Sequence, residues 1–114
     1  MDIEACRKIC KSLPGTTEDI KWGNDLCFSV GGKMFFVISL TAPHTFSFKV
    51  SDEDFDEMST REGFIPAPYL ARAKWVYAEQ PTKVKLKEGE KYIRASYELI
   101  KAKLTKKLRD SLGK

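Results

Sequence analysis

The chain contains few of the side chains that most often act in nucleophilic and acid–base catalysis: it has three cysteines and a single histidine, His44. A catalytic Ser, Cys or Thr needs a neighbouring base to remove its proton, and His44 is expected in a turn between two strands. The Gly-x-Ser-x-Gly sequence of a nucleophile elbow is absent. The sequence therefore predicts no catalytic residue, and we expect a protein that is not an enzyme.

The cysteines offer a redox pair or a metal site as the next candidate, and their spacing argues against both. Cys6 and Cys10 are four residues apart, so they share one face of a helix with Ile3 and Leu13. An odd number of cysteines cannot form a closed set of disulfides, and no Cys-x-x-Cys sequence occurs. Free cysteine is among the most commonly buried residue types. We therefore expect Cys6, Cys10 and Cys27 to be reduced core residues.

An acidic run after Ser51 is a further candidate metal site, because clustered carboxylates bind hard cations such as Mg²⁺ and Ca²⁺. Successive helical residues point in different directions, however, and only pairs such as Glu53 and Glu57 lie one above the other. Acids at the start of a helix are also favoured by the helix dipole. We expect the run to begin a helix, and we predict neither a metal site nor a cofactor. Its members are Asp52, Glu53, Asp54, Asp56 and Glu57.

Positive charge is concentrated in the last part of the chain. Residues 83–114 contain eleven Lys or Arg and four Asp or Glu, a net charge of +7, whereas residues 1–82 contain nine and twelve, a net charge of −3. A basic segment favours an anionic partner such as DNA. It is also typical of a solvated amphipathic helix, because these cations spread around the whole exposed side of the predicted helix. The charge pattern leaves both interpretations open.

The segment 63–77 combines two prolines with large aromatic side chains. Such a loop is rigid, and it could form a groove with the sheet in which Tyr69 stacks on a base or holds a small ligand. Arg72 and Lys74 would be the neighbouring cations. In the alternative interpretation, most of the aromatic residues belong to the core, and we expect Trp75 to be structural, between the sheet and a helix. The aromatic residues in question are Trp22, Tyr69, Trp75 and Tyr77.

Apolar periodicity predicts the elements that must position these residues. A helix over residues 3–12 begins after the capping residue Asp2 and ends at Leu13-Pro14-Gly15. Residues 16–24 are predicted to be a loop. Alternating apolar residues then predict strands over residues 26–30, 33–40 and 45–50, with a hairpin turn at Gly31-Gly32. A helix capped by Ser51, a strand over residues 74–79 and one long C-terminal helix that reaches Leu108 complete the chain.

The predicted fold is α+β, an antiparallel sheet of about four strands with helices packed on one face. A length of 114 residues suffices for one domain, residues 1–114, with an ordinary hydrophobic core. No apolar run approaches the roughly 20 residues that span a bilayer, and the acidic N-terminus does not resemble a signal peptide. We therefore expect a cytoplasmic protein with no membrane partner, either a monomer or a weak dimer.

A series of motifs resembles the MmcQ/YjbR family of small bacterial proteins over nearly the whole chain. The motifs are Leu13-Pro14-Gly15-Thr16, Gly32-Lys33-Met34-Phe35, Phe48-Lys49, Tyr69-Leu70 leading to Trp75-Val76, and Ser96-Tyr97. The resemblance implies a CyaY-like (frataxin-like) two-layer sandwich. It also implies DNA binding through a proposed double wing, in which two hairpins or loops flank a helix.

Applied to this sequence, the resemblance makes the hairpin at Gly31-Gly32 and the segment 42–45 the candidate wings. The candidate contacts to the DNA backbone are then Lys33, Lys49, Arg72 and Lys74. The net negative charge of residues 1–82 argues against a broad phosphate-binding surface there. A frataxin-like fold would also make the acidic run a minor candidate iron site. The main alternative to DNA binding is a small-ligand or protein-interaction module that uses the aromatic loop at residues 63–77, with Tyr69 in its groove.

Overall fold

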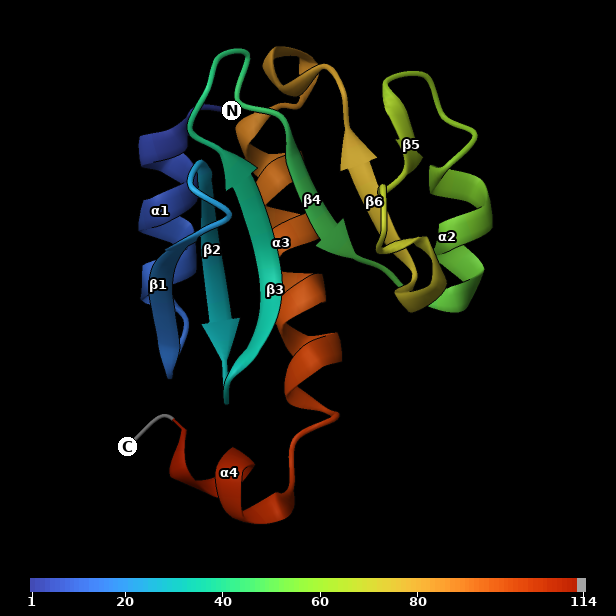
Figure 1. Ribbon diagram of the computed structural model, residues 1–114. Coiled ribbons are helices and arrows are strands. Elements are labelled where there is room, and N and C mark those ends of the chain that lie inside the picture. The colour runs from blue at the N-terminus through green and yellow to red at the C-terminus, as the bar shows by residue number, and fades with distance from the viewer. Residues whose placement is uncertain (113–114) are drawn as a thin grey trace.

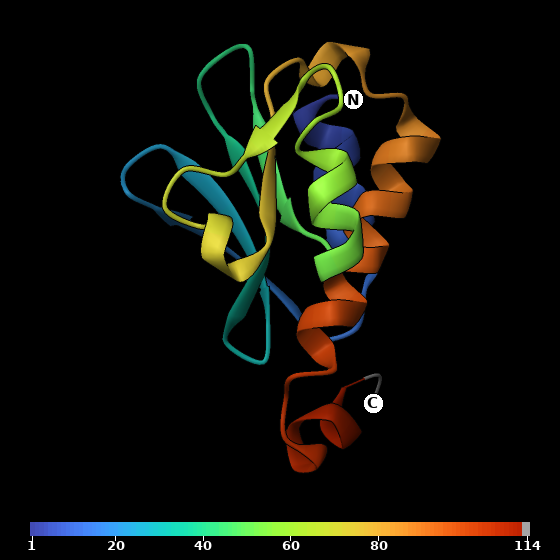
Figure 2. The same ribbon diagram turned by 90° about the vertical axis from the view of Figure 1, so that its right-hand side faces the viewer.

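The computed structural model describes residues 1–112, so the last two residues of the predicted domain lie outside it. Its helices and strands are α1 (Ile3–Ser12), β1 (Thr16–Lys21), β2 (Asp25–Val30), β3 (Lys33–Ser39), β4 (Phe46–Lys49), α2 (Asp52–Met58), β5 (Phe64–Pro66), the 3-10 helix η1 (Ala71–Ala73), β6 (Trp75–Ala78), the 3-10 helix η2 (Pro81–Lys83), α3 (Leu86–Lys101) and α4 (Lys106–Ser111). The strands form one antiparallel sheet in the order β1-β2-β3-β4-β6-β5. Helices α1, α2 and α3 cover one face of this sheet, and we call the opposite side the open face (Figures 1 and 2). The α+β class with helices on one face is thus as predicted.

Two helices begin at the capping residues identified in the sequence. The carboxylate of Asp2 accepts a hydrogen bond from the backbone N–H of Ala5 at 2.7 Å, at the start of α1. The hydroxyl of Ser51 accepts one from the N–H of Asp54 at 3.1 Å, at the start of α2. These contacts satisfy N–H groups that the first turn of a helix leaves unpaired. The prediction of these two helices is confirmed.

The two faces of the sheet differ in chemistry because side chains alternate along each strand. A row directed toward the helices consists of Phe28, Phe36, Phe48 and Val76, and the neighbouring row, on the open face, consists of Cys27, Val37, Ser47 and Tyr77. The first row is fully buried, whereas Tyr77 in the second is partly exposed. The hydrophobic core therefore lies between the sheet and the helices.

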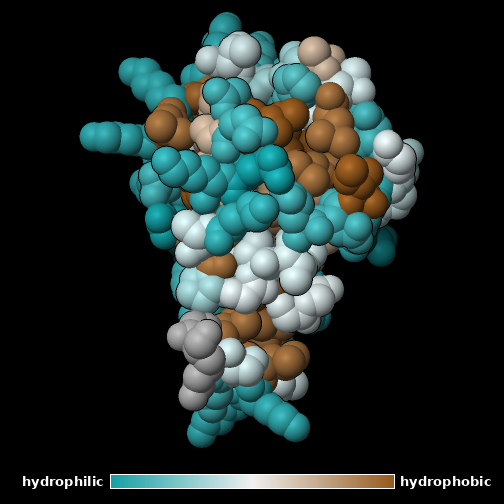
Figure 3. All heavy atoms as spheres, turned by 90° about the vertical axis from the view of Figure 1, so that its left-hand side faces the viewer, coloured by the Kyte–Doolittle hydropathy of each residue, from teal (hydrophilic) through white to brown (hydrophobic). Residues whose placement is uncertain are grey.

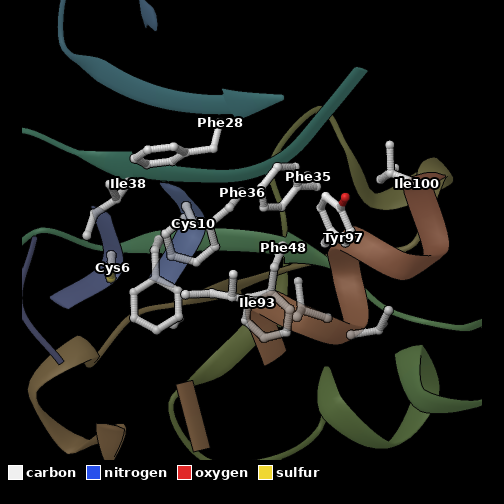
Figure 4. Packing of buried hydrophobic residues seen from close by; sticks show 14 of the residues in the cluster. Cys6, Cys10, Phe28, Phe35, Phe36, Ile38, Phe48, Ile93, Tyr97 and Ile100 are labelled. Carbon is white, nitrogen blue, oxygen red and sulfur yellow. The ribbon is translucent and has the colours of Figure 1, made fainter. Parts of the chain in front are cut away.

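That core is dominated by aromatic side chains (Figure 4). Phe35 meets Tyr97 of α3 edge to face, with ring centroids 5.4 Å apart. Phe48 of β4 stacks on Tyr92, also of α3, at 4.8 Å. Buried aromatic pairs in these geometries stabilise a fold beyond the area they remove from water. They attach α3 to the centre of the sheet.

The cysteines are free and buried, as expected. Cys6 and Cys10 project from α1 into the core (Figure 4), and Cys27 lies on the open face of β2. Burial raises the pKa of the Cys6 thiol to about 12 and raises that of Cys10 as well. A raised pKa keeps a thiol protonated and unreactive.

Trp75 is structural, but it does not pack between the sheet and a helix as predicted. Its side chain is only 4% exposed. The residue lies opposite Lys49 in the ladder, and Val76, which faces the helices, follows it, so Trp75 belongs to the open face. The loop before β6 covers it there, with the N–H of Ala67 bonded to its carbonyl and its own N–H bonded to the carbonyl of Leu70. Single-sequence patterns do not indicate which face a loop will cover.

The sheet has six strands instead of about four, because apolar periodicity detects neither edge strand. β1 occupies a segment predicted to be a loop, and β5 lies within the aromatic loop. β1 is mostly polar, since an edge strand buries little of its surface. Its core-facing residue is Glu18, whose carboxylate pairs with the guanidinium of Arg7 on α1. The distance from Arg7 Nε to Glu18 Oε2 is 2.7 Å. An ion pair therefore replaces the apolar residue that the pattern requires.

The prediction of one long C-terminal helix is wrong. α3 ends at Lys101, and α4 begins after Thr105, whose hydroxyl accepts a hydrogen bond from the N–H of Leu108 at 3.3 Å. Between the two helices, Leu104 is buried against Gly31 in the β2–β3 turn. The apolar spacing continues through the break, but the contact with the hairpin turns the chain.

The side of the molecule formed by α1 and β1 carries apolar atoms beside charged ones (Figure 3). Ile20 and Leu40 are exposed there and line a shallow hollow with Ile3 and Leu26. Across residues 1–112, no helix combines the length and the apolar character that crossing a bilayer requires.

Candidate functional site

Antiparallel pairing brings the predicted DNA contacts to one end of the sheet. β3 begins at Lys33, β4 ends at Lys49, and β6 begins directly after Lys74. Because these strands alternate in direction, the start of β3, the end of β4 and the start of β6 all lie at the lower end of the sheet in Figure 1. Arg72, in η1, lies at this end as well. Four residues from three separate segments thus share one region.

The C-terminal segment adds further cations to this region. Leu104 packs on Gly31, and α4 lies below the β2–β3 hairpin in Figure 1. Lys103 comes close enough to Lys49 to lower the pKa of that buried ammonium. We define the basic end as Lys33, Arg72, Lys74, Lys103, Lys106, Lys107 and Arg109. In the part of the chain that the structure describes, none of its members forms an ion pair.

Lys49 is buried rather than available to a partner, which distinguishes it from the other predicted contacts. Only 7% of the residue is exposed, and its Nζ donates a hydrogen bond to the carbonyl of Ala73 in η1. Burial lowers the pKa of its ammonium, and repulsion from Lys103 and Lys74 lowers it further, whereas Asp52 raises it. Lys49 therefore holds η1 against the sheet and positions the residues on either side of it.

The other three predicted cations differ in how firmly they are held. Lys33 and Arg72 are exposed, and their side chains form no hydrogen bond within residues 1–112. Lys74 is half-buried and adopts a left-handed backbone conformation with φ of 63°. Its Nζ lies 4.9 Å from the centre of the Phe55 ring. Lys33 and Arg72 are free to reach an anion, while Lys74 is fixed on an aromatic ring.

The two candidate wings lie far from one another. The Gly31-Gly32 turn precedes β3, and the segment 42–45 follows it, so the two lie at opposite ends of that strand (Figure 1). Successive turns of a meander always separate in this way. The segment 42–45 is therefore remote from the basic end, and the loop before β6 takes its place beside the hairpin.

A second candidate site is a groove on the open face, with a volume of about 520 Å³. Two aromatic side chains rise at its sides: Trp22, in the turn between β1 and β2, is 71% exposed, and Tyr69 is fully exposed. Val37, Ser47 and Tyr77 form its floor. The groove thus lies between the aromatic loop and the sheet, where the ligand-binding alternative expected one.

The polar groups of this groove are few. The hydroxyl of Tyr77 donates a hydrogen bond to Thr45 Oγ1 at 2.7 Å, so it is held in place. Among residues 1–112, Asp25 is the one carboxylate that lines the groove, and neither Lys nor Arg lines it. Sequence analysis did not identify Asp25 or Met34 as groove residues. Strand alternation places Asp25 on the open face, and the register shift between Phe28 and Ser29 brings Met34 there as well. The groove itself exists only because two distant loops lie beside these residues.

A larger hollow of about 1090 Å³ lies between α2 and α3 on the helical side. Its apolar floor includes Phe48 and Tyr92, and charges of both signs line its rim. The acidic run of α2 begins beside it, and no group of three or more metal-binding side chains converges anywhere in residues 1–112. The carboxylates of the run thus remain separate on the helix surface.

Comparison with known proteins assigns the chain to a family. The sequence matches the YjbR family model over residues 11–99. The crystal structure of a Deinococcus radiodurans protein with the family-model domain DUF419 superposes with a TM-score of 0.86 at 26% identity, covering 97% of this chain and 87% of the other. A Pseudomonas syringae protein superposes with a TM-score of 0.72 at 16% identity, covering 88% and 99%, a likeness of fold alone. No curated protein matches. Because the family match spans most of the sheet and helices, the chain belongs to the MmcQ/YjbR family, as its motifs indicated.

Proposed function

We propose that this protein is a non-enzymatic DNA-binding protein that contacts the phosphate backbone through its basic end. The observation that carries the proposal is the convergence of cations from the β2–β3 hairpin, the loop before β6 and the α3–α4 segment on one end of the sheet. Cations without intramolecular ion pairs release counterions when they meet phosphates, and this release drives non-specific binding. A net charge of +7 in residues 83–114 supplies a field that attracts DNA.

The arrangement supports a modified double wing on a CyaY-like sandwich. The Gly31-Gly32 hairpin touches Leu104 from one side, and Lys49 with η1 approaches Lys103 from the other. A hairpin and a loop thus flank the α3–α4 segment, in place of the hairpin and the segment 42–45. Contacts through Lys side chains carry little sequence information. We therefore expect weak binding with little preference among duplexes.

Three features support a role without catalysis. The imidazole of His44 forms a hydrogen bond within its own turn, with Nδ1 2.9 Å from the carbonyl oxygen of Ser39. The Cys6 and Cys10 thiols are buried and have raised pKa values, so they are poor nucleophiles. Lys49 has a lowered pKa, but its ammonium is enclosed and bonded to a backbone carbonyl. The two thiols and the Lys49 ammonium are thus enclosed within the fold, and the half-buried His44 has no nucleophile or acid bonded to it within residues 1–112.

The test is a fluorescence anisotropy titration of a labelled duplex at about 50 mM and about 200 mM salt. We expect affinity to fall steeply between the two conditions, and the slope of log K against log salt to flatten by about one unit for each cation removed. Lys33→Glu with Arg72→Glu should abolish binding at the higher salt. Lys83→Glu, an exposed lysine of η2 at the other end of the sheet, is the matched control and should keep most of the affinity.

Two outcomes would contradict the proposal. One is affinity that does not depend on salt. The other is a loss of affinity per charge changed that is the same in Lys33→Glu with Arg72→Glu as in Lys83→Glu. That result would mean that only the net charge of the protein matters and that no defined surface binds the DNA.

A further inference from the structure

None of the cations of the basic end lines the groove on the open face, and the chemistry of its described lining residues points to a different ligand. We propose that it is a binding site for an organic cation, an alkylated or quaternary ammonium group, held between Trp22 and Tyr69 with Asp25 as its counter-ion. This inference is independent of DNA binding, because the groove and the basic end use different residues.

The two aromatic walls are held in unusual backbone conformations. Trp22 has φ of 54° and Tyr69 has φ of 66°, in the left-handed region that bulky residues rarely adopt. Gly23, beside Trp22, also has a positive φ of 78°, so the β1–β2 turn would favour Asn, Asp or Gly at position 22. Neither ring gains compensating burial, since both are exposed. Strained residues that stabilise no core are characteristic of binding sites.

The composition of the groove selects the charge of the ligand. Its apolar surface comes from Met34, Val37, Pro68 and Leu70, and its polar groups are the Asp25 carboxylate with the Ser47 and Tyr77 hydroxyls. An anion would find no cation among the lining residues and one carboxylate that repels it. A cation is attracted both by the faces of aromatic rings and by that carboxylate.

The Asp25 carboxylate is available for this role. Within residues 1–112 its side chain accepts no hydrogen bond and forms no ion pair. Lys21 lies directly opposite in the β1–β2 ladder, yet its ammonium is not within ion-pair distance. A volume of about 520 Å³ is ample for an ammonium group with a short organic body. A compact cation with apolar substituents therefore matches the groove in size, shape and charge.

The experiment compares choline with its neutral isostere 3,3-dimethylbutan-1-ol, which has the same shape without the charge. Each is titrated into ¹⁵N-labelled full-length protein and followed by NMR, with the indole N–H of Trp22 and the amides of residues 69 and 70 as reporters. We expect choline to shift these signals and to bind about tenfold more tightly than the neutral alcohol. Trp22→Asn, which suits the left-handed turn, should abolish binding of both probes. Asp25→Asn should reduce the preference for choline to the part that the aromatic rings supply, and it should leave binding of the alcohol unaffected.

Leu86→Asn is the matched control, because Leu86 is exposed on α3 and lies outside the groove. Equal binding of the two probes would overturn the cation preference while leaving an apolar site. Shifts that survive Trp22→Asn, or no shifts with either probe, would overturn the site itself. The wild-type titration with duplex DNA tests the basic end separately.

Discussion

Lys49 and Ser96 join the sheet to α3 at a buried polar contact. The backbone N–H of Lys49 donates a hydrogen bond to Ser96 Oγ at 2.9 Å, and the same hydroxyl donates to the carbonyl of Phe35 at 2.7 Å. Ser96 is fully buried. One hydroxyl therefore satisfies a donor on β4 and an acceptor on β3 where the helix crosses them, and it fixes the strand end from which Lys49 reaches η1.

Ser96→Ala should destabilise the protein by about 1–3 kcal/mol, because it leaves a buried backbone N–H without an acceptor. The measurement is the urea midpoint of unfolding. Ser12→Ala is the control: that hydroxyl bonds to the carbonyl of Ile9 on the exposed side of α1, so its loss should change stability by less than about 0.5 kcal/mol. Similar losses in the two variants would show that the Ser96 bridge contributes nothing specific.

Trp75→Ala should cost about 3–5 kcal/mol, since the side chain is buried beneath the loop before β6. Trp22→Ala makes the same substitution at an exposed ring and should cost less than about 1 kcal/mol. Thermal unfolding of both variants separates the structural tryptophan from the one in the groove. A small loss at Trp75 would mean that the loop does not stay closed over it in solution.

Gly31→Ala should destabilise more than Gly32→Ala, although both residues have a positive φ. The left-handed conformation costs either alanine about 1–2 kcal/mol. Only at Gly31 would the new methyl group also collide with the side chain of Leu104, 2.7 Å away, whereas Gly32 faces open space. Chemical denaturation measures the difference, and limited proteolysis near Leu104 should increase in Gly31→Ala alone. Equal behaviour of the two variants would place the α3–α4 segment away from the hairpin.

Stability should fall as pH rises above about 8.5, the ordinary pKa of a cysteine thiol. Burial raises the pKa of Cys6 to about 12 and raises that of Cys10, so above pH 8.5 the unfolded chain loses protons that the folded chain keeps. The contribution of the two thiols to the free energy of unfolding is therefore complete below the unfolded-state pKa. It is lost progressively as the pH rises from the unfolded-state pKa to the folded-state pKa.

The double variant Cys6→Ala with Cys10→Ala tests this assignment. It should be less stable at pH 7 because of the lost packing, and its stability should decline less steeply between about pH 8 and about pH 10. Burial also raises the pKa of Tyr92 to about 12, so some decline should remain at higher pH. An unchanged slope in the double variant would assign the alkaline effect to other groups.

The motifs that identify the family meet one another in the fold. Ser96 bonds to Phe35 and Lys49, and the hydroxyl of Tyr97 donates to the carbonyl of Pro14. All of these contacts lie where α3 crosses the strands and the end of α1. The family motifs are therefore the residues that attach α3 to the sheet and to the end of α1. Because these residues have structural roles, sharing them indicates a shared fold more securely than a shared activity.

The sequence by itself determined the α+β class, the helices that begin after Asp2 and Ser51, the central strands and the family. The class, the helices and the strands depend on interactions between near neighbours in the chain or on apolar alternation, which a single sequence displays. The family is indicated by motifs that occur in order along the chain. Tertiary structure alone decided the rest. The polar edge strand β1 forms because Arg7 on α1 neutralises Glu18, and the C-terminal helix breaks because Leu104 packs on Gly31. The basic end and the aromatic groove exist because strand direction brings distant turns together, and residue spacing along the chain carries no record of which turns will meet.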